Sequence, residues 1–194
     1  RASTWAMAAG AVVAVVAGGA AAAADLVAAA RPGGGDMDLA RTARHLLTTR
    51  HGIKRCLTDA DLAAIDQAIA ESMALHQVQI HFAIEPALHP IELWREVEPH
   101  ERALELFSEL RVWDTEHNRG VLIYVLLADR AIEILADRHV HGYVGAARWA
   151  AIVDAMRAEF ARGRYREGVL DAIAAIRRDL AGCAASTSYR SERA

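Results

Sequence analysis

The sequence has little cysteine, proline and lysine, and each shortage excludes a class of protein. Two cysteines in 194 residues are too few for a disulfide scaffold. Four prolines and 13 glycines exclude a collagen-like or low-complexity chain. Lys54 is the single lysine, no basic tract is present and the formal net charge is −3, which together argue against a nucleic-acid partner. The chain is 54% hydrophobic, and its length suits one domain with a sizeable core.

Several motifs of cofactor and catalytic sites are also missing. The sequence has no GxGxxG after a predicted strand and no GxxxxGK[ST], so we expect no nucleotide partner. It has no GxSxG nucleophile elbow either. Cys56 and Cys183 lie far apart in the sequence, and two separate thiols are expected rather than a disulfide.

Residues 1–36 form an Ala-rich apolar segment that differs from the rest of the chain. No charged residue occurs from Trp5 to Ala24, and a helix of that length would match the ~30 Å hydrocarbon core of a bilayer. Three interpretations stay open: a membrane anchor or uncleaved signal, a cleaved signal peptide, and sequence upstream of an initiator at Met37. The first two predict a membrane-associated or exported protein, and the third predicts a cytoplasmic one. The fold prediction therefore leaves residues 1–36 out.

Residues 37–56 are a basic, amphipathic lead-in to the domain. Arginines and histidines are interspersed with Leu39, Ala43, Leu46 and Leu47. Two interpretations stay open: a helix that packs on the surface of the domain, or an interfacial helix that rests on anionic lipid.

The segment 57–182 carries the periodicities of a folded domain, and residues 183–194 form a polar tail. Helical spacing of apolar residues predicts helices over 59–76, from 99 to about 111, over 149–160 and over 169–180, with Thr58 as the first N-cap and Gly163 and Gly182 as stops. Strands are predicted over 77–84, 121–128 and 131–137.

The order of these elements predicts the fold class. Residues 121–128 are continuously apolar, which is typical of a strand that is buried on both faces. Helices precede and follow it, so both faces can be covered. We therefore expect an α/β fold, a three-layer α/β/α sandwich with a small mixed sheet containing one β-hairpin. The hairpin is expected to close with a two-residue turn at Asp129 and Arg130.

Polar side chains gather in two loops that this hairpin brings to one edge of the sheet. The first is the polar loop 113–120, and the second is the stretch 138–145, which is predicted as a loop that holds two histidine rings on one side. Carboxylates with imidazoles suit zinc or manganese, and carboxylates with amide oxygens suit calcium. The alternative is that these residues are polar because loops are solvated and need capping. The candidate ligands of a divalent metal ion are Asp114, His117, Asn118, Asp137, His139 and His141.

Two polar residues on predicted strands are expected to be structural. His81 is expected to be a packed or solvated imidazole rather than a metal ligand. Glu133 is expected to form an ion pair with an arginine rather than to act as a general base.

Three stretches, in order and at the right spacing, resemble the TPM domain family over about residues 57–181. Asn118-Arg119-Gly120 leads into the apolar strand, as in the family's N-x-G motif. The stretch 129–134 is similar to its D-R-x-[IV]-x-I hairpin. The third stretch resembles its closing segment through Phe160, Gly163, Tyr165, Gly168 and Val169.

The resemblance implies an α/β sandwich that is usually exported and membrane-tethered, with calcium bound in some members. The family includes a thylakoid-lumen acid phosphatase, a photosystem repair factor and a receptor modulator. Here residues 137–142 replace the family's G-Y-G-L-E-G, so a glutamate is lost and two histidines are gained, which favours zinc or manganese over calcium. We expect an accessory or interaction domain that assists a membrane-associated complex through an unidentified protein partner. The alternative is a metal-assisted, acid-phosphatase-like hydrolase.

Overall fold

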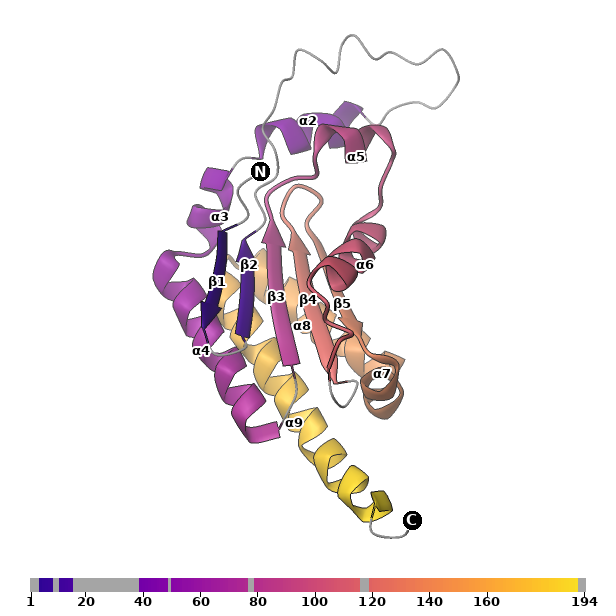
Figure 1. The fold of residues 1–194 in the computed structure, drawn as a ribbon. Coiled ribbons are helices and arrows are strands. Elements are labelled where there is room, and N and C mark those ends of the chain that lie inside the picture. The colour runs from indigo at the N-terminus through magenta and orange to yellow at the C-terminus, as the bar shows by residue number, and fades with distance from the viewer. Residues whose placement is uncertain are drawn as a thin grey trace.

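A mixed β-sheet forms the centre of the molecule, in the strand order β1-β2-β3-β4-β5 (Figure 1). The computed structural model describes residues 4–8, 11–15, 39–48, 50–76, 79–115 and 119–191. β2 and β4 run parallel to β3, whereas β1 and β5 are antiparallel to their neighbours. The strands are β1 (Thr4–Ala8), β2 (Ala11–Val15), β3 (Gln79–Glu85), β4 (Gly120–Leu126) and β5 (Ala131–Ala136).

Helices cover both faces of this sheet, which confirms the predicted three-layer α/β/α fold. Helices α4, α8 and α9 lie on one face, and α6 lies on the other (Figure 1). Apolar side chains of the sheet divide accordingly into two clusters, one on each face. The helices are α2 (Leu39–Leu47), α3 (Arg50–Cys56), α4 (Asp59–His76), α5 (Pro90–Trp94), α6 (Pro99–Glu109), α7 (Arg138–Val144), α8 (Ala146–Ala161) and α9 (Tyr165–Ser191).

Strand β4 is buried along its whole length, as its continuous apolar sequence predicts. Ile123 and Val125 pack in the cluster under α8 and α9, and Leu122 and Tyr124 pack in the cluster under α6. Gly120 begins the strand because a Cβ there would lie 1.9 Å from the carbonyl oxygen of Val112, so no side chain fits.

The N-terminal strands differ from the prediction, which left residues 1–36 out of the fold. β2 pairs with β3 in parallel, with Val13 opposite Phe82. The physical reason is the valine content of the β2 segment AVVAV, because β-branched side chains favour strands. In the described part of the chain no helix is long and apolar enough to cross a membrane. The three interpretations of what this segment does for the protein stay predictions.

The hairpin of β4 and β5 is confirmed, but its turn is longer than predicted. Leu126 pairs with Ala131, so four residues, 127–130, form the turn instead of two. The backbone N–H groups of residues 127 and 128 donate to the carbonyl oxygens of Glu85 and Pro86, both at 3.0 Å. The chain therefore follows the end of β3 before it reverses, with Arg130 at a φ of 53°.

The C-terminal helix is also longer than predicted. The helix was expected to stop at Gly182 and leave a polar tail over 183–194, but α9 runs to Ser191. An interior glycine weakens a helix by about 1 kcal/mol relative to alanine but does not end it. Gly163 does separate α8 from α9 as predicted, with a φ of 75°.

Replacing Ile123 in β4 by alanine tests the central strand. We expect Ile123→Ala to lower the free energy of unfolding by about 2–4 kcal/mol, because it removes buried methyl groups and leaves a cavity. The matched control is Ile91→Ala, because Ile91 is 58% exposed, and it should change stability by less than about 0.5 kcal/mol. Urea denaturation followed by circular dichroism measures both. Equal effects would contradict the buried position of β4.

Candidate functional site

The predicted site at the open end of the hairpin is built around Asp137. The N–H of Gly120 donates to Asp137 Oδ2 at 2.8 Å, and the Asp137 N–H donates to the Gly120 carbonyl oxygen at 2.9 Å. Asp137 therefore adds the last hydrogen bonds between β4 and the chain after β5, at the point where β4 begins. Burial is the main cause that raises the pKa of Asp137, and the hydrogen bond from Gly120 opposes it.

His139 and His141 lie on a helix and not in the loop that the sequence predicted. The stretch 138–145 was expected to be a loop, but residues 138–144 form helix α7. Successive residues of a helix are about 100° apart, so residues i and i+2 point to nearly opposite sides. Both histidines are exposed. The prediction that their rings lie on one side is therefore wrong.

Asp114 is also exposed and lies in the turn after α6, where its N–H donates to the carbonyl oxygen of Arg111 at 2.9 Å. His117 and Asn118 lie outside the described residues. Within the part of the chain that is described, no group of three or more His, Cys, Asp or Glu side chains could hold a metal ion. The divalent metal site therefore stays a prediction.

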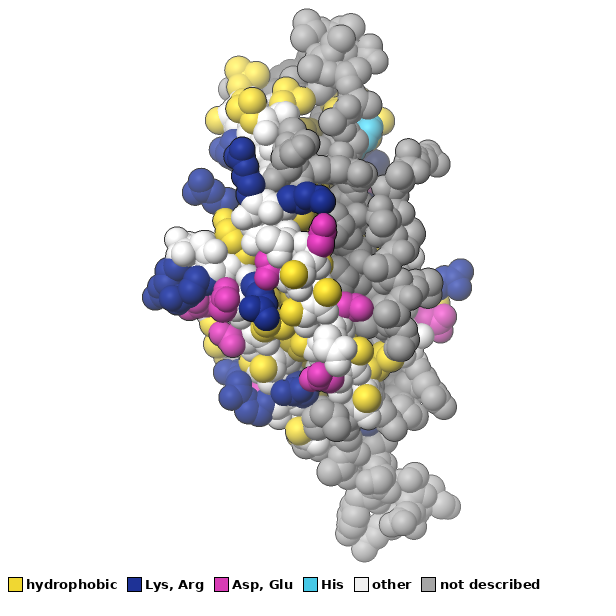
Figure 2. Space-filling view, turned by 90° about the vertical axis from the view of Figure 1, so that its left-hand side faces the viewer, with side chains coloured by type: hydrophobic (Ala, Val, Ile, Leu, Met, Phe, Trp, Pro, Cys, Tyr) yellow, Lys and Arg dark blue, Asp and Glu magenta, His cyan; other side chains and the backbone are white. Residues whose placement is uncertain are grey.

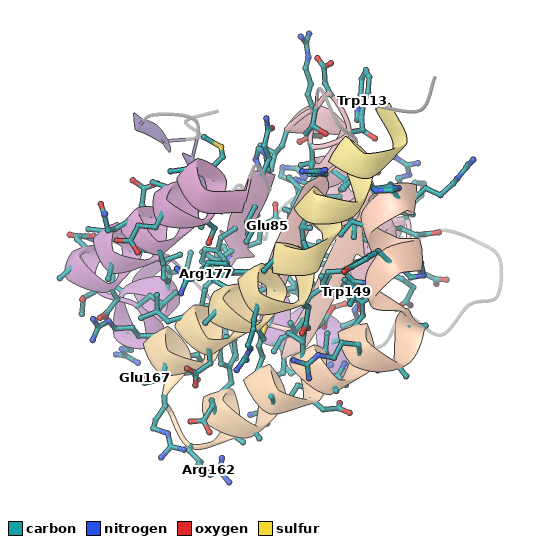
Figure 3. The ribbon with its side chains drawn as sticks, turned by 90° about the horizontal axis from the view of Figure 1, so that it is seen from below. Glu85, Trp113, Trp149, Arg162, Glu167 and Arg177 are labelled. Atoms are coloured by element: carbon teal, nitrogen blue, oxygen red, sulfur yellow. The ribbon has the colours of Figure 1, made fainter. Side chains whose placement is uncertain are left out.

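Helix α6 is joined to the sheet by a buried ion pair that the sequence analysis did not predict. Glu85, the last residue of β3, is 3% exposed. Seen from below, Glu85 lies inside the molecule, whereas Arg162 lies at its edge (Figure 3). Arg102 donates from Nη2 to Glu85 Oε1 at 2.9 Å and from Nε to Oε2 at 3.2 Å. Tyr124 donates its hydroxyl to Oε2 at 2.6 Å. The buried polar groups of these three side chains therefore have hydrogen-bond partners in one another.

Further carboxylates surround Arg102. Glu105 approaches it at 3.0 Å, Glu109 at 3.6 Å and Glu92 at 3.7 Å. Burial lowers the pKa of Arg102, but the hydrogen bonds and charge of Glu85 outweigh burial and raise it. Burial also raises the pKa of Glu85 itself, against the effect of Arg102. Because the guanidinium is already surrounded by carboxylates, this cluster holds α6 in place and does not suit an anionic substrate.

His81 lies on the same face of β3 as Glu85 and is buried, with 6% of its surface exposed. Neither ring nitrogen has a hydrogen-bond partner among the described residues. Burial lowers the pKa of His81 to about 4, so the ring is neutral near pH 7. The expected packed imidazole is therefore present. Glu133, in contrast, pairs with His100 Nδ1 at 3.2 Å, and no ion pair joins it to an arginine in the part of the chain that the structure describes.

Lowering the pH should reduce the free energy of unfolding, because the buried ring of His81 resists protonation. Its pKa is lowered on folding, so its full contribution to stability is present above pH ~6.5 and is lost as the pH falls from there toward 4. Between pH 7 and pH 5 we expect the wild type to lose about 2 kcal/mol more free energy of unfolding than His81→Leu loses. Chemical denaturation at the two pH values measures this difference. Parallel pH profiles would show that the ring is solvated.

A second polar cluster fixes helix α2 against the hairpin turn. Asp129, in the turn, accepts from Arg41 Nη2 at 2.9 Å and from Arg41 Nε at 3.1 Å. Its other oxygen lies 2.9 Å from His45 Nε2. Arg41 Nη2 also donates to the carbonyl oxygen of Val97 at 2.7 Å. Burial raises the pKa of Asp129, but the hydrogen bonds from Arg41 and His45 outweigh burial and lower it.

The tautomer of His45 follows from its two neighbours. The N–H of Leu88 donates to His45 Nδ1 at 3.0 Å, so Nδ1 is an acceptor and carries no proton. Nε2 therefore carries the proton and donates it to Asp129. The imidazole is 3% exposed and joins α2 to both the turn and the segment before α5. Of the two interpretations of residues 37–56, packing on the domain is the one that these contacts support.

Helix α2 presents its apolar side chains to solvent. Leu39 is 76% exposed and Leu47 is 82% exposed, and Leu46 is also exposed. At about 100° per residue these leucines lie on the side of the helix opposite to Arg41 and His45. The helix is therefore inverted relative to an ordinary surface helix, which buries its apolar side.

Helix α5 adds to this exposed apolar surface. Ile91 and Trp94 are both exposed. The contacts of Arg41 with Val97 and of His45 with Leu88 hold α2 beside the segment that contains α5, and the two helices lie together at one end of the molecule (Figure 1). Figure 2 shows hydrophobic side chains gathered at that end. The α2–α5 surface is defined here as Leu39, Leu46, Leu47, Ile91 and Trp94.

Comparison with known proteins gives the family. The family model described as the TPM domain matches residues 54–179. The chain belongs to the TPM domain family. A search of curated proteins found no match.

Two solved structures support the TPM fold. The BA42 protein of the psychrophilic bacterium Bizionia argentinensis is 25% identical with a TM-score of 0.57, and the match covers 65% of this chain and 82% of that one. The N-terminal domain of a protein from P. gingivalis is 20% identical with a TM-score of 0.56, covering 66% and 79% respectively.

Removing the carboxylate of Asp129 should detach α2. We expect Asp129→Ala to lower the free energy of unfolding by about 1–3 kcal/mol, because Arg41 and His45 lose a half-buried acceptor. Hydrogen exchange of the Leu88 amide should become faster at the same time. The control is Asp154→Ala, which removes an exposed ion pair to Arg157 at 3.4 Å and should cost less than about 1 kcal/mol. An unchanged Leu88 amide would contradict this account of the cluster.

Proposed function

We propose that this chain is an accessory interaction domain that binds a partner protein through the α2–α5 surface, in which α2 precedes the TPM match and α5 lies within it. The observation that carries the proposal is the inverted orientation of α2. Its leucines face solvent because Arg41 and His45 are held inward by Asp129. Apolar side chains that are exposed together at one end of a molecule are typical of protein interfaces.

The composition of the surface supports a protein as the occupant. Tryptophan is among the residues that are enriched at the centre of interfaces, and the leucines add apolar area around it. Arg44 on α2 and Arg95, directly after α5, are exposed and supply a polar rim. The finer proposal is that the partner belongs to a membrane-associated complex, which is what the tethered members of the family suggest.

Site-specific photo-crosslinking can identify this partner. A photoreactive residue at position 47 of the full chain, introduced in the source cells, should capture one protein reproducibly. The same residue at position 150, which is exposed on α8, should not capture it. Capture only of lipid, or the same proteins at both positions, would contradict a docking surface on α2 and α5.

Affinity for the captured partner then gives the quantitative test. Leu47→Asp should weaken binding by at least tenfold, because it places a charge in the centre of the apolar contact. The matched control is Leu104→Asp, because Leu104 is an exposed leucine on α6, outside this surface. Calorimetry with purified proteins measures both variants. Equal losses in the two variants would contradict the proposal.

Asp137 favours a second candidate function, the metal-assisted, acid-phosphatase-like hydrolase. Its half-buried carboxylate has a raised pKa and lies beside Gly120, at the end of the sheet where β4 begins. Hydrolysis of p-nitrophenyl phosphate that zinc, manganese or calcium supports, that EDTA removes and that Asp137→Asn abolishes would establish it. If none of the three metals supports hydrolysis, the hydrolase is excluded and the interaction domain stays as the one proposed function.

A further inference from the structure

A cavity of about 520 Å³ opens between α3, the end of α8, the start of α9 and the hairpin turn. This volume lies within the range of small-molecule sites. Its apolar lining comes from both the sheet and α8, and includes Leu126, Ile132 and Phe160. We refer to it as the α3–α8 pocket. None of the five residues of the α2–α5 surface lines it.

The charged side chains that line the α3–α8 pocket are positive. Arg130 and Arg157 line it, and among the described residues no aspartate or glutamate does. Arg157 forms an ion pair at 3.4 Å with Asp154, which is exposed. A second cavity, between α8 and α9, is different because arginines and carboxylates both line it. The α3–α8 pocket is therefore the one that favours an anion.

Polar hydrogen-bonding groups lie beside these cations. Tyr165, at the start of α9, and Cys56 of α3 line the pocket together with Arg130. Arg130 itself has a φ of 53°, a conformation that glycine or asparagine adopts at lower cost.

We propose that the α3–α8 pocket binds a small organic anion with an apolar body, such as a medium-chain carboxylate. The anionic head contacts Arg130 and Arg157, with the Tyr165 hydroxyl as an additional donor. The apolar body packs on Ile132 and Phe160. This ligand site is independent of the proposed protein-binding surface.

Displacement of the fluorescent anion 8-anilinonaphthalene-1-sulfonate from the full chain tests the proposal. Decanoate should displace it, and decanol should be at least tenfold weaker because it lacks the charge. Arg130→Gln should weaken decanoate at least fivefold and leave decanol unchanged. The matched control is Arg138→Gln, which removes an exposed arginine on α7 and should behave as wild type. Equal affinity for decanoate and decanol would overturn the anionic specificity.

A pocket-filling variant gives a second, independent arm. Ala161 is exposed at the end of α8 and lines the pocket, so Ala161→Trp should fold, as circular dichroism can verify, and should abolish decanoate binding. Leu47→Asp should leave decanoate binding unchanged, which separates this site from the α2–α5 surface. Unchanged binding in Ala161→Trp, or equal losses in Arg130→Gln and Arg138→Gln, would overturn the proposal.

Discussion

The carboxylate of Asp129 sits in the turn between β4 and β5 and accepts hydrogen bonds from two residues of α2. Arg41 reaches it with two nitrogens, and His45 reaches it with Nε2. Both partners lie far from Asp129 in the sequence, so the contact is made only when the sheet is complete. The orientation of α2, and with it the exposure of the leucines, depends on this acceptor together with the contacts of Arg41 with Val97 and of His45 with Leu88. A half-buried carboxylate with two donors is thus the link between the fold and the proposed interaction surface.

The position of Asp129 depends in turn on the buried strands beneath it. β4 is buried throughout, and the first two residues of the turn, 127 and 128, bond to Glu85 and Pro86 at the end of β3. Glu85 is held by Arg102 and Tyr124, which also fixes α6. The turn therefore projects from a rigid end of the sheet. A rigid base favours binding, because little conformational freedom is lost when a partner docks.

Local patterns predicted most of the fold. The apolar run of β4 predicted burial on both faces, and the helical spacings predicted α4, α6 and α8. The predictions for two segments were wrong, and each error has a physical reason. Residues 138–144 contain Gly142 and two histidines, which suggest a loop, yet Val140 and Val144 lie one turn apart and pack against the core, so packing overrides propensity. The valines of β2 fit a strand, but the length of the apolar segment suggested a membrane helix.

The candidate site was harder to predict, because its contacts join distant segments. Periodicity identified 37–56 as amphipathic, but it cannot tell which side of α2 faces the domain. That side is decided by Asp129, which lies 84 residues from His45. The same holds for Arg102 and Glu85, whose pairing spans the connection between β3 and α6. For His117 and Asn118, which lie outside the described residues, the metal prediction has not been tested.

Methyl NMR with a soluble paramagnetic agent tests the inverted orientation of α2 most directly. The methyl signals of Leu39 and Leu47 should be strongly broadened by the agent, to an extent similar to those of the exposed Leu104. The methyl signals of Leu106, which is 1% exposed, should stay sharp. If Leu39 and Leu47 were protected to the same extent as Leu106, α2 would bury its apolar side, and both the role of Asp129 and the proposed interaction surface would be contradicted.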